Sequence, residues 1–291
     1  MAEEQIKQSP GVYRRKVGDA LVTVVNDGFL DMPLAIMRGA TRDEMEQLLR
    51  DVFGPPEPRI TVNAFVIETG KHTVLVDAGG GSTTVYSMGL LPDNLAVAGF
   101  KPEDIDAVLL THIHPDHSSG LVDKNGDAMF PRAEVFVHGD EFDFWSDPAL
   151  RDGSVPAATP YLEPADMLLS TYKGRFRKTD GGEVLPGITQ LHMPGHTPGH
   201  SGYQLDSAGD KLLIWGDTVH VPEIQIPVPG VTSEFDISEP QAADSRRKIF
   251  AHAAAERVVI TGGHVHMPGF AHIVPHGEGY RLIPETWAVA I

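Results

Sequence analysis

Histidines grouped with aspartates are the residues of this chain that could carry chemistry, since 14 of its 291 residues are histidine. The ten residues from position 111 read THIHPDHSSG. Residues two apart in an extended segment face the same side, so His112 and His114 are predicted to bind one cation together. Pro115 is expected to prevent a helix at this point, which would direct Asp116 and His117 towards a second cation. Imidazole nitrogen and carboxylate oxygen together suit Zn, Mn, Fe or Co.

Three later segments also place a polar side chain within a few residues of the end of an apolar run. His196 follows the run at 188–191, in a turn where Gly195 has no side chain to keep another backbone away. Asp217 follows LLIW and a glycine, and its two oxygens could bridge two cations. His264 follows VVI and TGG. Rigid strands fix positions while the loops after them present side chains, so the pattern predicts ligands at strand ends.

A chance grouping of residues is the alternative explanation for the first motif. At the histidine and aspartate frequencies of this chain, an accidental match is expected about two times in a thousand. The motif therefore favours a metal site over isolated structural histidines. Cysteine is absent, which excludes disulfides, thiolate zinc ligands and a cysteine nucleophile.

The charge of the chain argues against two classes of partner. The net charge is −17, whereas a nucleic-acid site needs clustered Lys and Arg, and an anionic membrane surface attracts basic segments. No apolar run approaches the length of about 18 residues that predicts a membrane span. Residues 1–10, MAEEQIKQSP, have no apolar core and do not predict a secretory signal, so we expect a cytoplasmic protein.

Short strands and helices alternate along the chain and must position the polar segments. The apolar runs predict strands at residues 21–25, 64–68, 73–76, 107–110, 134–137, 188–191, 211–215 and 257–261. Thr41 and Glu44 form the pattern of a capping box ahead of a helix, residues 102–105 predict a helical turn, and 245–256 predict an amphipathic helix. No boundary divides the chain, so residues 1–291 are predicted to form a single α/β domain. Residues 146–180 predict an insertion or a lid.

The order of the motifs HxHxDH, GHTxGH, GD and a late GH resembles the metallo-β-lactamase superfamily, from about residue 13 to residue 284. This resemblance implies an α/β fold with four layers, an αβ/βα sandwich in which two mixed β-sheets pack face to face with helices outside. It also implies two divalent metal ions per chain, zinc before Mn, Fe or Co. The ligands implied for the first ion are His112, His114 and His196, and those for the second are Asp116, His117 and His264, with Asp217 bridging both.

Two further residues match family positions that support the ligands. Asp77 resembles an aspartate that accepts a hydrogen bond from a ligand imidazole and so fixes the orientation of the ring. His200 closes the GHTxGH motif and would be structural rather than a ligand.

Within the superfamily the chain resembles most the methyl parathion hydrolase-like group, which includes organophosphate, lactone and aryl-ester hydrolases. By this resemblance Trp145, with Phe142 beside it, would line the substrate pocket, although ordinary core packing is an equal alternative for these aromatic residues. His220 and Phe235 are also expected in the pocket. They stand where the organophosphate specialists of the group have leucine, which favours lactones or aryl esters as substrates.

The resemblance implies a hydrolase in which two ions about 3.5–4 Å apart share a bridging hydroxide. Asp217 and Asp116 are the predicted catalytic carboxylates, Asp217 as the acceptor of the hydroxide proton. The substrate would be a small apolar ester or lactone, with weaker activity on phosphotriesters, and the chain would pair as a homodimer. Two alternatives stay open: a dedicated organophosphate hydrolase, and a non-catalytic metal-binding or iron redox protein.

Overall fold

Strand β4 (Arg59–Glu68) is buried on both of its faces, and this burial determines the layers of the fold. Side chains alternate along a strand, so Phe65 points to one face and its neighbours Ala64 and Val66 to the other. Phe65 packs in a core that also contains Tyr203 of a second sheet. Ala64 and Val66 pack in a separate core beneath helices. A strand of this kind must lie inside a layered structure.

The computed structural model describes residues 9, 11–81 and 87–291, and it contains two seven-stranded sheets. The first sheet has the order β1 (Val12–Val17), β2 (Ala20–Asp31), β4, β5 (Thr73–Val76), β6 (Ala107–Leu109), β7 (Glu134–His138), β8 (Phe176–Thr179). The second has the order β16 (Gly279–Pro284), β15 (Ala271–His276), β14 (Val259–Thr261), β12 (Asp210–Ile214), β11 (Ser201–Ser207), β10 (Ile188–His192), β9 (Gly182–Leu185). A two-stranded sheet pairs β3 (Met37–Arg38) with β13 (Thr232–Ser233).

Both large sheets are mixed. In the first, β5, β6, β7 and β8 run parallel to one another, whereas β1, β2, β4 and β5 pair antiparallel. In the second sheet β12 and β14 are parallel and the other pairs are antiparallel. The carboxyl ends of β6, β12 and β14 are the places where three of the predicted ligand segments begin.

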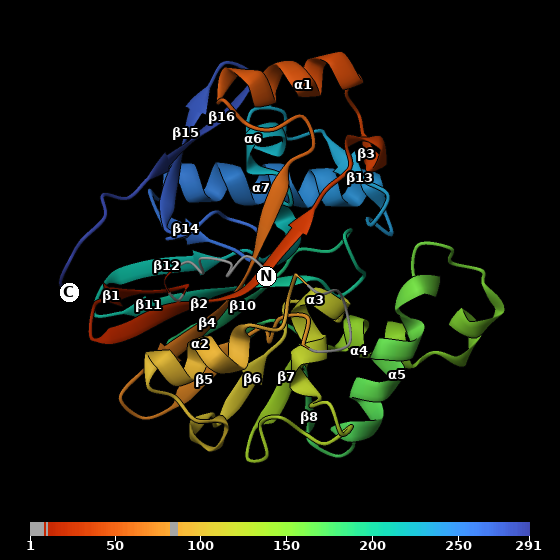
Figure 1. The fold of residues 1–291 in the computed structure, drawn as a ribbon, viewed down its shortest axis with the longest axis vertical. Coiled ribbons are helices and arrows are strands. Elements are labelled where there is room, and N and C mark those ends of the chain that lie inside the picture. The colour runs from red at the N-terminus through yellow and green to blue at the C-terminus, as the bar shows by residue number, and fades with distance from the viewer. Residues whose placement is uncertain (1–8, 10, 82–86) are drawn as a thin grey trace, which may run out of the picture.

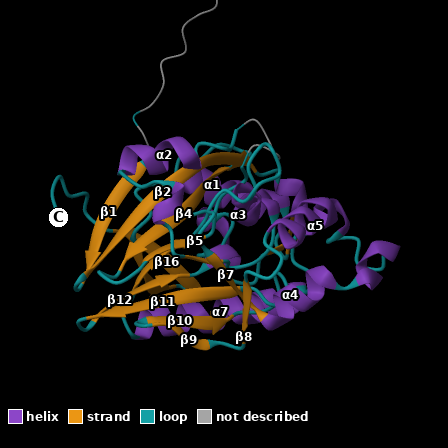
Figure 2. Cartoon of the chain, turned by 90° about the horizontal axis from the view of Figure 1, so that it is seen from below, coloured by secondary structure: helices purple, strands orange, loops and turns teal. Residues whose placement is uncertain are grey.

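Helices cover the outer face of each sheet (Figures 1 and 2). The first sheet packs against residues of α2 (Leu91–Ala98), α4 (Gly139–Ser146) and α5 (Leu162–Thr171), and the second against α7 (Glu239–Ala255). Three further helices are α1 (Arg42–Asp51) and the four-residue helices α3 (Pro115–Ser118) and α6 (Pro222–Gln225). Helix, sheet, sheet and helix are four layers, so the predicted αβ/βα sandwich is confirmed.

Every predicted strand is present, and the main errors concern helices. Thr41 caps α1, and the capping box with Glu44 forms as predicted. The helix predicted from residue 245 begins at Glu239, and its first turns are already buried at Ala242 and Ala243. The expectation that Pro115 prevents a helix is wrong: Pro115 begins α3. Proline is tolerated in a first helical turn, where its missing N–H would have no partner.

The segment predicted as an insertion or lid contains more regular structure than its composition suggests. It includes 3-10 helices at Pro148–Asp152 and Thr159–Tyr161 and the ten-residue helix α5. Its last residues form β8, which pairs with β7, so the segment ends inside the sheet. In Figure 1 the residues before α5 (bright green) extend away from the sheets at one side of the molecule.

Two sequence predictions concern the surroundings of the chain. Among the described helices, none has the length and apolarity needed to cross a membrane. The prediction made from residues 1–10, that no secretory signal is present, lies outside the described residues except for Ser9.

Candidate metal centre

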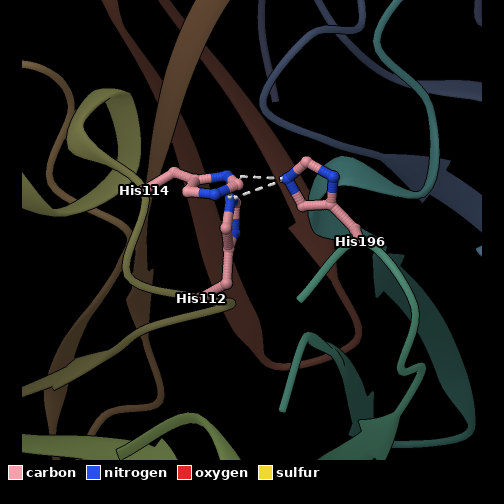
Figure 3. A group of neighbouring side chains, drawn as sticks. All are labelled: His112, His114 and His196. Atoms are coloured by element: carbon pink, nitrogen blue, oxygen red, sulfur yellow. Dashed lines mark hydrogen bonds between the residues drawn. The ribbon is translucent and has the colours of Figure 1, made fainter. Parts of the chain in front are cut away.

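Three of the predicted ligands converge from two different loops. His112 and His114 follow β6 of the first sheet, and His196 follows β10 of the second. Figure 3 shows the three imidazoles pointing toward one another. His112 Nε2 lies 3.0 Å from His114 Nδ1, His114 Nδ1 lies 2.8 Å from His196 Nε2, and His196 Nε2 lies 3.2 Å from His112 Nε2. Nitrogens about 2.0–2.1 Å from one zinc ion lie about 3.3 Å apart, so these atoms fit the ligand positions of one ion.

A second group of ligands lies beside the first. It comprises one carboxylate oxygen from each of two aspartates and two imidazole nitrogens, from Asp116, His117, Asp217 and His264. His117 Nε2 lies 3.0 Å from Asp217 Oδ1 and 3.4 Å from Asp116 Oδ2. His264 Nε2 lies 3.3 Å and 3.5 Å from the same two oxygens. Two nitrogens and two hard oxygens suit a divalent transition metal ion.

The carboxylate of Asp217 lies between the two groups and faces both. Oδ1 is directed to His117 and His264, as described above. Oδ2 lies 3.4 Å from His196 Nε2 and 3.7 Å from His112 Nε2. The bridging position that the sequence predicted for Asp217 is therefore present in the geometry. All seven predicted ligands come together at this centre, although Asp116 and His117 lie in helix α3 and not in a segment without helix.

Each ligand imidazole that approaches with Nε2 has its other nitrogen fixed by a hydrogen-bond partner. These pairs are His112 with Thr111 Oγ1 at 3.0 Å, His117 with Asp77 Oδ2 at 2.8 Å, His196 with Asp236 Oδ1 at 2.9 Å and His264 with the Thr61 carbonyl at 2.7 Å. An oxygen that accepts a hydrogen bond from the far nitrogen keeps the ring proton on that nitrogen and leaves the near nitrogen free to bind a metal. Among the described residues, His117 Nε2 and Asp217 Oδ1, which face the second ligand group, are buried without a hydrogen-bond partner. The residues therefore fit a pair of divalent cations.

The partners of the ligands include one predicted and one missed carboxylate. Asp77 accepts the hydrogen bond that its motif position predicted, and it also binds the backbone N–H of Thr111 at 2.8 Å. Asp236 has the same relation to His196, and its other oxygen accepts from the Ser233 N–H at 2.9 Å. No spacing rule connects positions 196 and 236, so only the three-dimensional structure reveals the second pair.

The electrostatics of the centre favour neutral imidazoles at His112 and His114 and ionised carboxylates at Asp116 and Asp217. Burial, followed by the nearby His117, lowers the pKa of His112 well below its ordinary value. Burial by itself would raise the pKa of Asp217, but the imidazoles of His117 and His264 outweigh it and hold that pKa well below its usual range. At His117 the carboxylates of Asp217, Asp116 and Asp77 together outweigh burial and raise the pKa of the imidazole well above its ordinary value. A cluster with this surplus of negative charge is suited to cations.

Gly195 allows the loop that carries His196 to approach helix α7 closely. Gly195 has φ +131°, and a Cβ there would lie 2.1 Å from the backbone nitrogen of Ala242 in α7, which confirms the close approach predicted at this position.

His200 lies next to the bridging residue: its Nε2 accepts the N–H of Asp217 at 2.9 Å, while its Nδ1 donates to the Met193 carbonyl at 2.9 Å. His200 thus positions the backbone of Asp217 and is structural, as predicted.

A cavity of about 380 Å³ opens above the ligands. Its floor is formed by five residues of the centre, His114, Asp116, His196, Asp217 and His264, and its remaining walls by Leu30, Met32, Ile60, Met88, Pro115, Pro160, Tyr161, Pro164, His220 and Phe235. The walls are apolar apart from His220 and the Tyr161 hydroxyl. Lysine and arginine are absent from the described residues that line it.

The structure separates the four predicted pocket residues into two pairs. His220 and Phe235 line the cavity, and His220 Nε2 lies 3.2 Å from Asp217 Oδ2. Trp145 does not line it: the side chain is fully buried in the core behind His114. Phe142 also packs in this core, against Phe176. The pocket prediction is therefore wrong for Trp145 and Phe142, because helix α4 turns this aromatic segment into the layer beneath the first sheet.

Tyr161 supplies the aromatic wall that Trp145 was predicted to supply. It belongs to the segment predicted as a lid, and its ring lies 4.7 Å, between centroids, from that of His114. Burial and the charge of Asp116 raise its pKa to about 12, so the hydroxyl keeps its proton at neutral pH. An isolated tyrosine in a Pro-rich stretch gives no sequence signal for such a position.

The fold and this centre define a known class of protein. The family model of the metallo-beta-lactamase superfamily matches residues 58–281, and the chain belongs to this superfamily. An N-acyl homoserine lactonase from Bacillus sp is 25% identical over 249 residues, which cover 78% of this chain and 86% of the relative.

Two solved structures are similar over almost their whole length. The crystal structure of the hydrolase AbOPH, in the beta lactamase superfamily, has a TM-score of 0.92 and 31% sequence identity, and the match covers 97% of this chain and 100% of that one. AidC, a dizinc quorum-quenching lactonase in complex with a product, an N-acyl-L-homoserine, has a TM-score of 0.91 and 25% sequence identity, and the match covers 96% of this chain and 99% of that one. The comparisons support a metal-dependent hydrolase with divalent ions at this centre. Membership in the methyl parathion hydrolase-like group stays a prediction.

Proposed function

We propose that this chain is a hydrolase that opens lactones with the help of two divalent cations, zinc foremost. The observation that carries the proposal is Asp217, whose two carboxylate oxygens face two separate ligand groups. A single ion would need only one of these groups. The product-bound dizinc lactonase among the similar structures gives independent support for a lactone as substrate.

The residues around the centre would divide the work of hydrolysis. When bound, the two cations supply an acidified water and a Lewis acid for the substrate oxygen. Asp77 and Asp236 hold His117 and His196 in the tautomers that leave their Nε2 atoms free. Asp217 would bind both cations and so fix the two ligand groups relative to each other, and it is placed to accept the proton of the attacking water. The apolar walls limit the contact of the centre with bulk water, which strengthens electrostatic interactions with developing charge.

The cavity favours a neutral substrate with an apolar portion. Phe235 and Tyr161 offer ring faces to a flat group or an acyl chain, and the methionines Met32 and Met88 can adapt to different shapes. Among the described residues, the lining has no Lys or Arg to recognise a substrate carboxylate or an anionic phosphate. With few hydrogen-bond partners such a pocket discriminates weakly, so aryl esters are expected as further substrates. Phosphotriesters are expected to be poorer substrates, because His220 and Phe235 stand in the lining where the organophosphate specialists have leucine.

A panel of four substrates tests the proposal: dihydrocoumarin, an acyl-homoserine lactone, p-nitrophenyl acetate and methyl parathion, each with the zinc-loaded protein. We expect the lactones to have the highest kcat/KM and methyl parathion the lowest. Turnover of the phosphotriester far above every ester would replace the proposal with the organophosphate hydrolase. Metal binding without turnover of any of the four would favour a non-catalytic metal protein. A homodimer and a cytoplasmic location stay predictions.

A further inference from the structure

A fully buried carboxylate that is not a ligand lies between the two loops that supply the first ion site. Glu141 belongs to α4, and its side chain is 0% exposed. Oε1 accepts the backbone N–H of Ile113 at 2.8 Å and the indole N–H of Trp145 at 2.7 Å. Oε2 accepts the Thr197 hydroxyl at 2.5 Å and the backbone N–H of Gly199 at 3.1 Å. One side chain therefore joins three separate elements.

The donors to Glu141 lie directly beside ligands of the first ion site. Ile113 lies between His112 and His114, and Thr197 directly follows His196. Each carboxylate oxygen thus holds the backbone next to ligands of the first site. The described hydrogen bonds of Glu141 include none to the segment at 263–265 that carries the second-site ligand His264.

A second observation, independent of the hydrogen bonds, shows how closely the His196 loop is seated on α4. A Cβ built on Gly199 would lie 2.1 Å from the backbone nitrogen of Glu141 and 2.5 Å from its Cβ. A side chain at position 199 would therefore push the loop away from the helix. The absence of that side chain lets the Gly199 N–H reach the carboxylate.

The environment of Glu141 is costly for a carboxylate. Among the described residues, no Lys, Arg or His side chain is within ion-pair distance of it, and its four donors are neutral groups. Burying a charge without a counter-ion is unfavourable unless its hydrogen bonds are complete. A buried anion next to the loops of the first ion site would be further stabilised by the positive charge of an ion held there.

We propose that Glu141 is a positioning residue that sets the affinity of the first ion site by fixing His114 and His196 relative to each other. The inference rests on the proposed two-ion function. Glutamine at this position keeps the size of the side chain, but its amide nitrogen cannot accept a hydrogen bond, so one of the two loops loses its anchor. Loss of a group that orients ligands typically weakens metal binding about 10–100-fold, and we expect a weakening of this size at the first site only.

The test measures zinc affinity, by competition with a chromophoric chelator, in two backgrounds that isolate the sites. His264→Ala leaves the first ligand group intact, and His196→Ala leaves the second. Glu141→Gln is expected to weaken zinc binding about 10–100-fold in the His264→Ala background and to leave it unchanged in the His196→Ala background. The control is Asp143→Asn, an exposed carboxylate of the same helix that pairs with Lys178; it should change neither affinity.

A milder variant keeps the test decisive if Glu141→Gln does not fold. Thr197→Val removes a single hydrogen bond to the carboxylate and should weaken the first site in the same selective way. Equal weakening in both backgrounds, or none in the His264→Ala background, would overturn the inference. Failure of the unaltered protein to bind two ions would instead refute the proposed function, so the two failures are distinguishable.

Discussion

Replacement of the bridging carboxylate, Asp217→Asn, is the substitution whose effect the geometry defines most sharply. Asp217 is 3% exposed, and each of its oxygens faces a different ligand group. Asparagine has nearly the same shape but only one oxygen. Its amide nitrogen would turn two hydrogens towards the imidazole nitrogens of the other group and occupy the lone pairs that a metal ion needs.

The size of the effect follows from this loss. Removal of a group that merely orients a ligand costs about 10–100-fold in affinity or activity. Removal of a ligand shared by both ions should exceed that range, so we expect turnover below about 1% of the unaltered protein, equivalent to at least about 2.7 kcal/mol of transition-state stabilisation. One of the two ions should also be lost on gel filtration.

The assay is kcat/KM for dihydrocoumarin at saturating zinc, together with metal content per chain and a circular dichroism spectrum to verify folding. Asp244→Asn is a matched control, because Asp244 is an exposed aspartate on α7 that pairs with Lys248. The control should keep full activity and both ions. If Asp217→Asn retains two ions and turnover within tenfold of the unaltered protein, the bridging role is refuted.

Two further predictions concern stability. Burial, only partly offset by hydrogen bonds from the backbone of Gly80 and Leu91, raises the pKa of Asp27 to about 6. The folded chain therefore binds more protons than the unfolded chain between about pH 4 and 6, and the contribution of Asp27 to the free energy of unfolding falls by about 3 kcal/mol as the pH rises through this window. Urea unfolding at pH 4 and pH 7 measures this change: the free energy of unfolding should fall more between the two pH values in the unaltered protein than in Asp27→Asn. An equal change in both proteins would contradict the prediction. Phe65→Ala, in the core between the sheets, should lower the free energy of unfolding by about 3–5 kcal/mol, whereas the exposed Phe53→Ala should change it by less than about 0.5 kcal/mol. A loss below about 1 kcal/mol for Phe65→Ala would show that the two sheets do not depend on this contact.

The ligands could be predicted from the sequence because their signal is local. Four of the seven lie within six residues, and the other three each follow an apolar strand, so residue type and spacing suffice to find them. The layers could also be predicted, since the motif order resembles one superfamily and the apolar runs mark most of the strands. The strand pairing itself depends on contacts between distant residues, which no short pattern contains.

The residues that orient the ligands could be predicted only in part. Asp77 lies in a recognisable motif, but Asp236 and Glu141 reach their partners across 40 and 28–58 positions. A buried carboxylate that accepts hydrogen bonds has the same letter as an exposed one. The chain therefore gives no local sign that these two acidic residues belong to the centre.

The pocket was predicted least well, for a reason of packing. An aromatic residue near a metal motif can face the cavity or the core, and Trp145 takes the core because helix α4 buries it and Glu141 binds its indole N–H. Helix α5 was not predicted within the segment expected to be an insertion or a lid, although Pro164 in its first turn is compatible with a helix. The wall residue Tyr161 lies just before this unrecognised helix.

Titration of the metal-free protein with zinc, while lactone hydrolysis is followed, tests the central claim most directly. If the two ligand groups that share Asp217 act as one centre, activity should rise with added zinc and reach its plateau at two ions per chain. A plateau at one ion, or lactone hydrolysis by the fully chelated protein, would contradict the account.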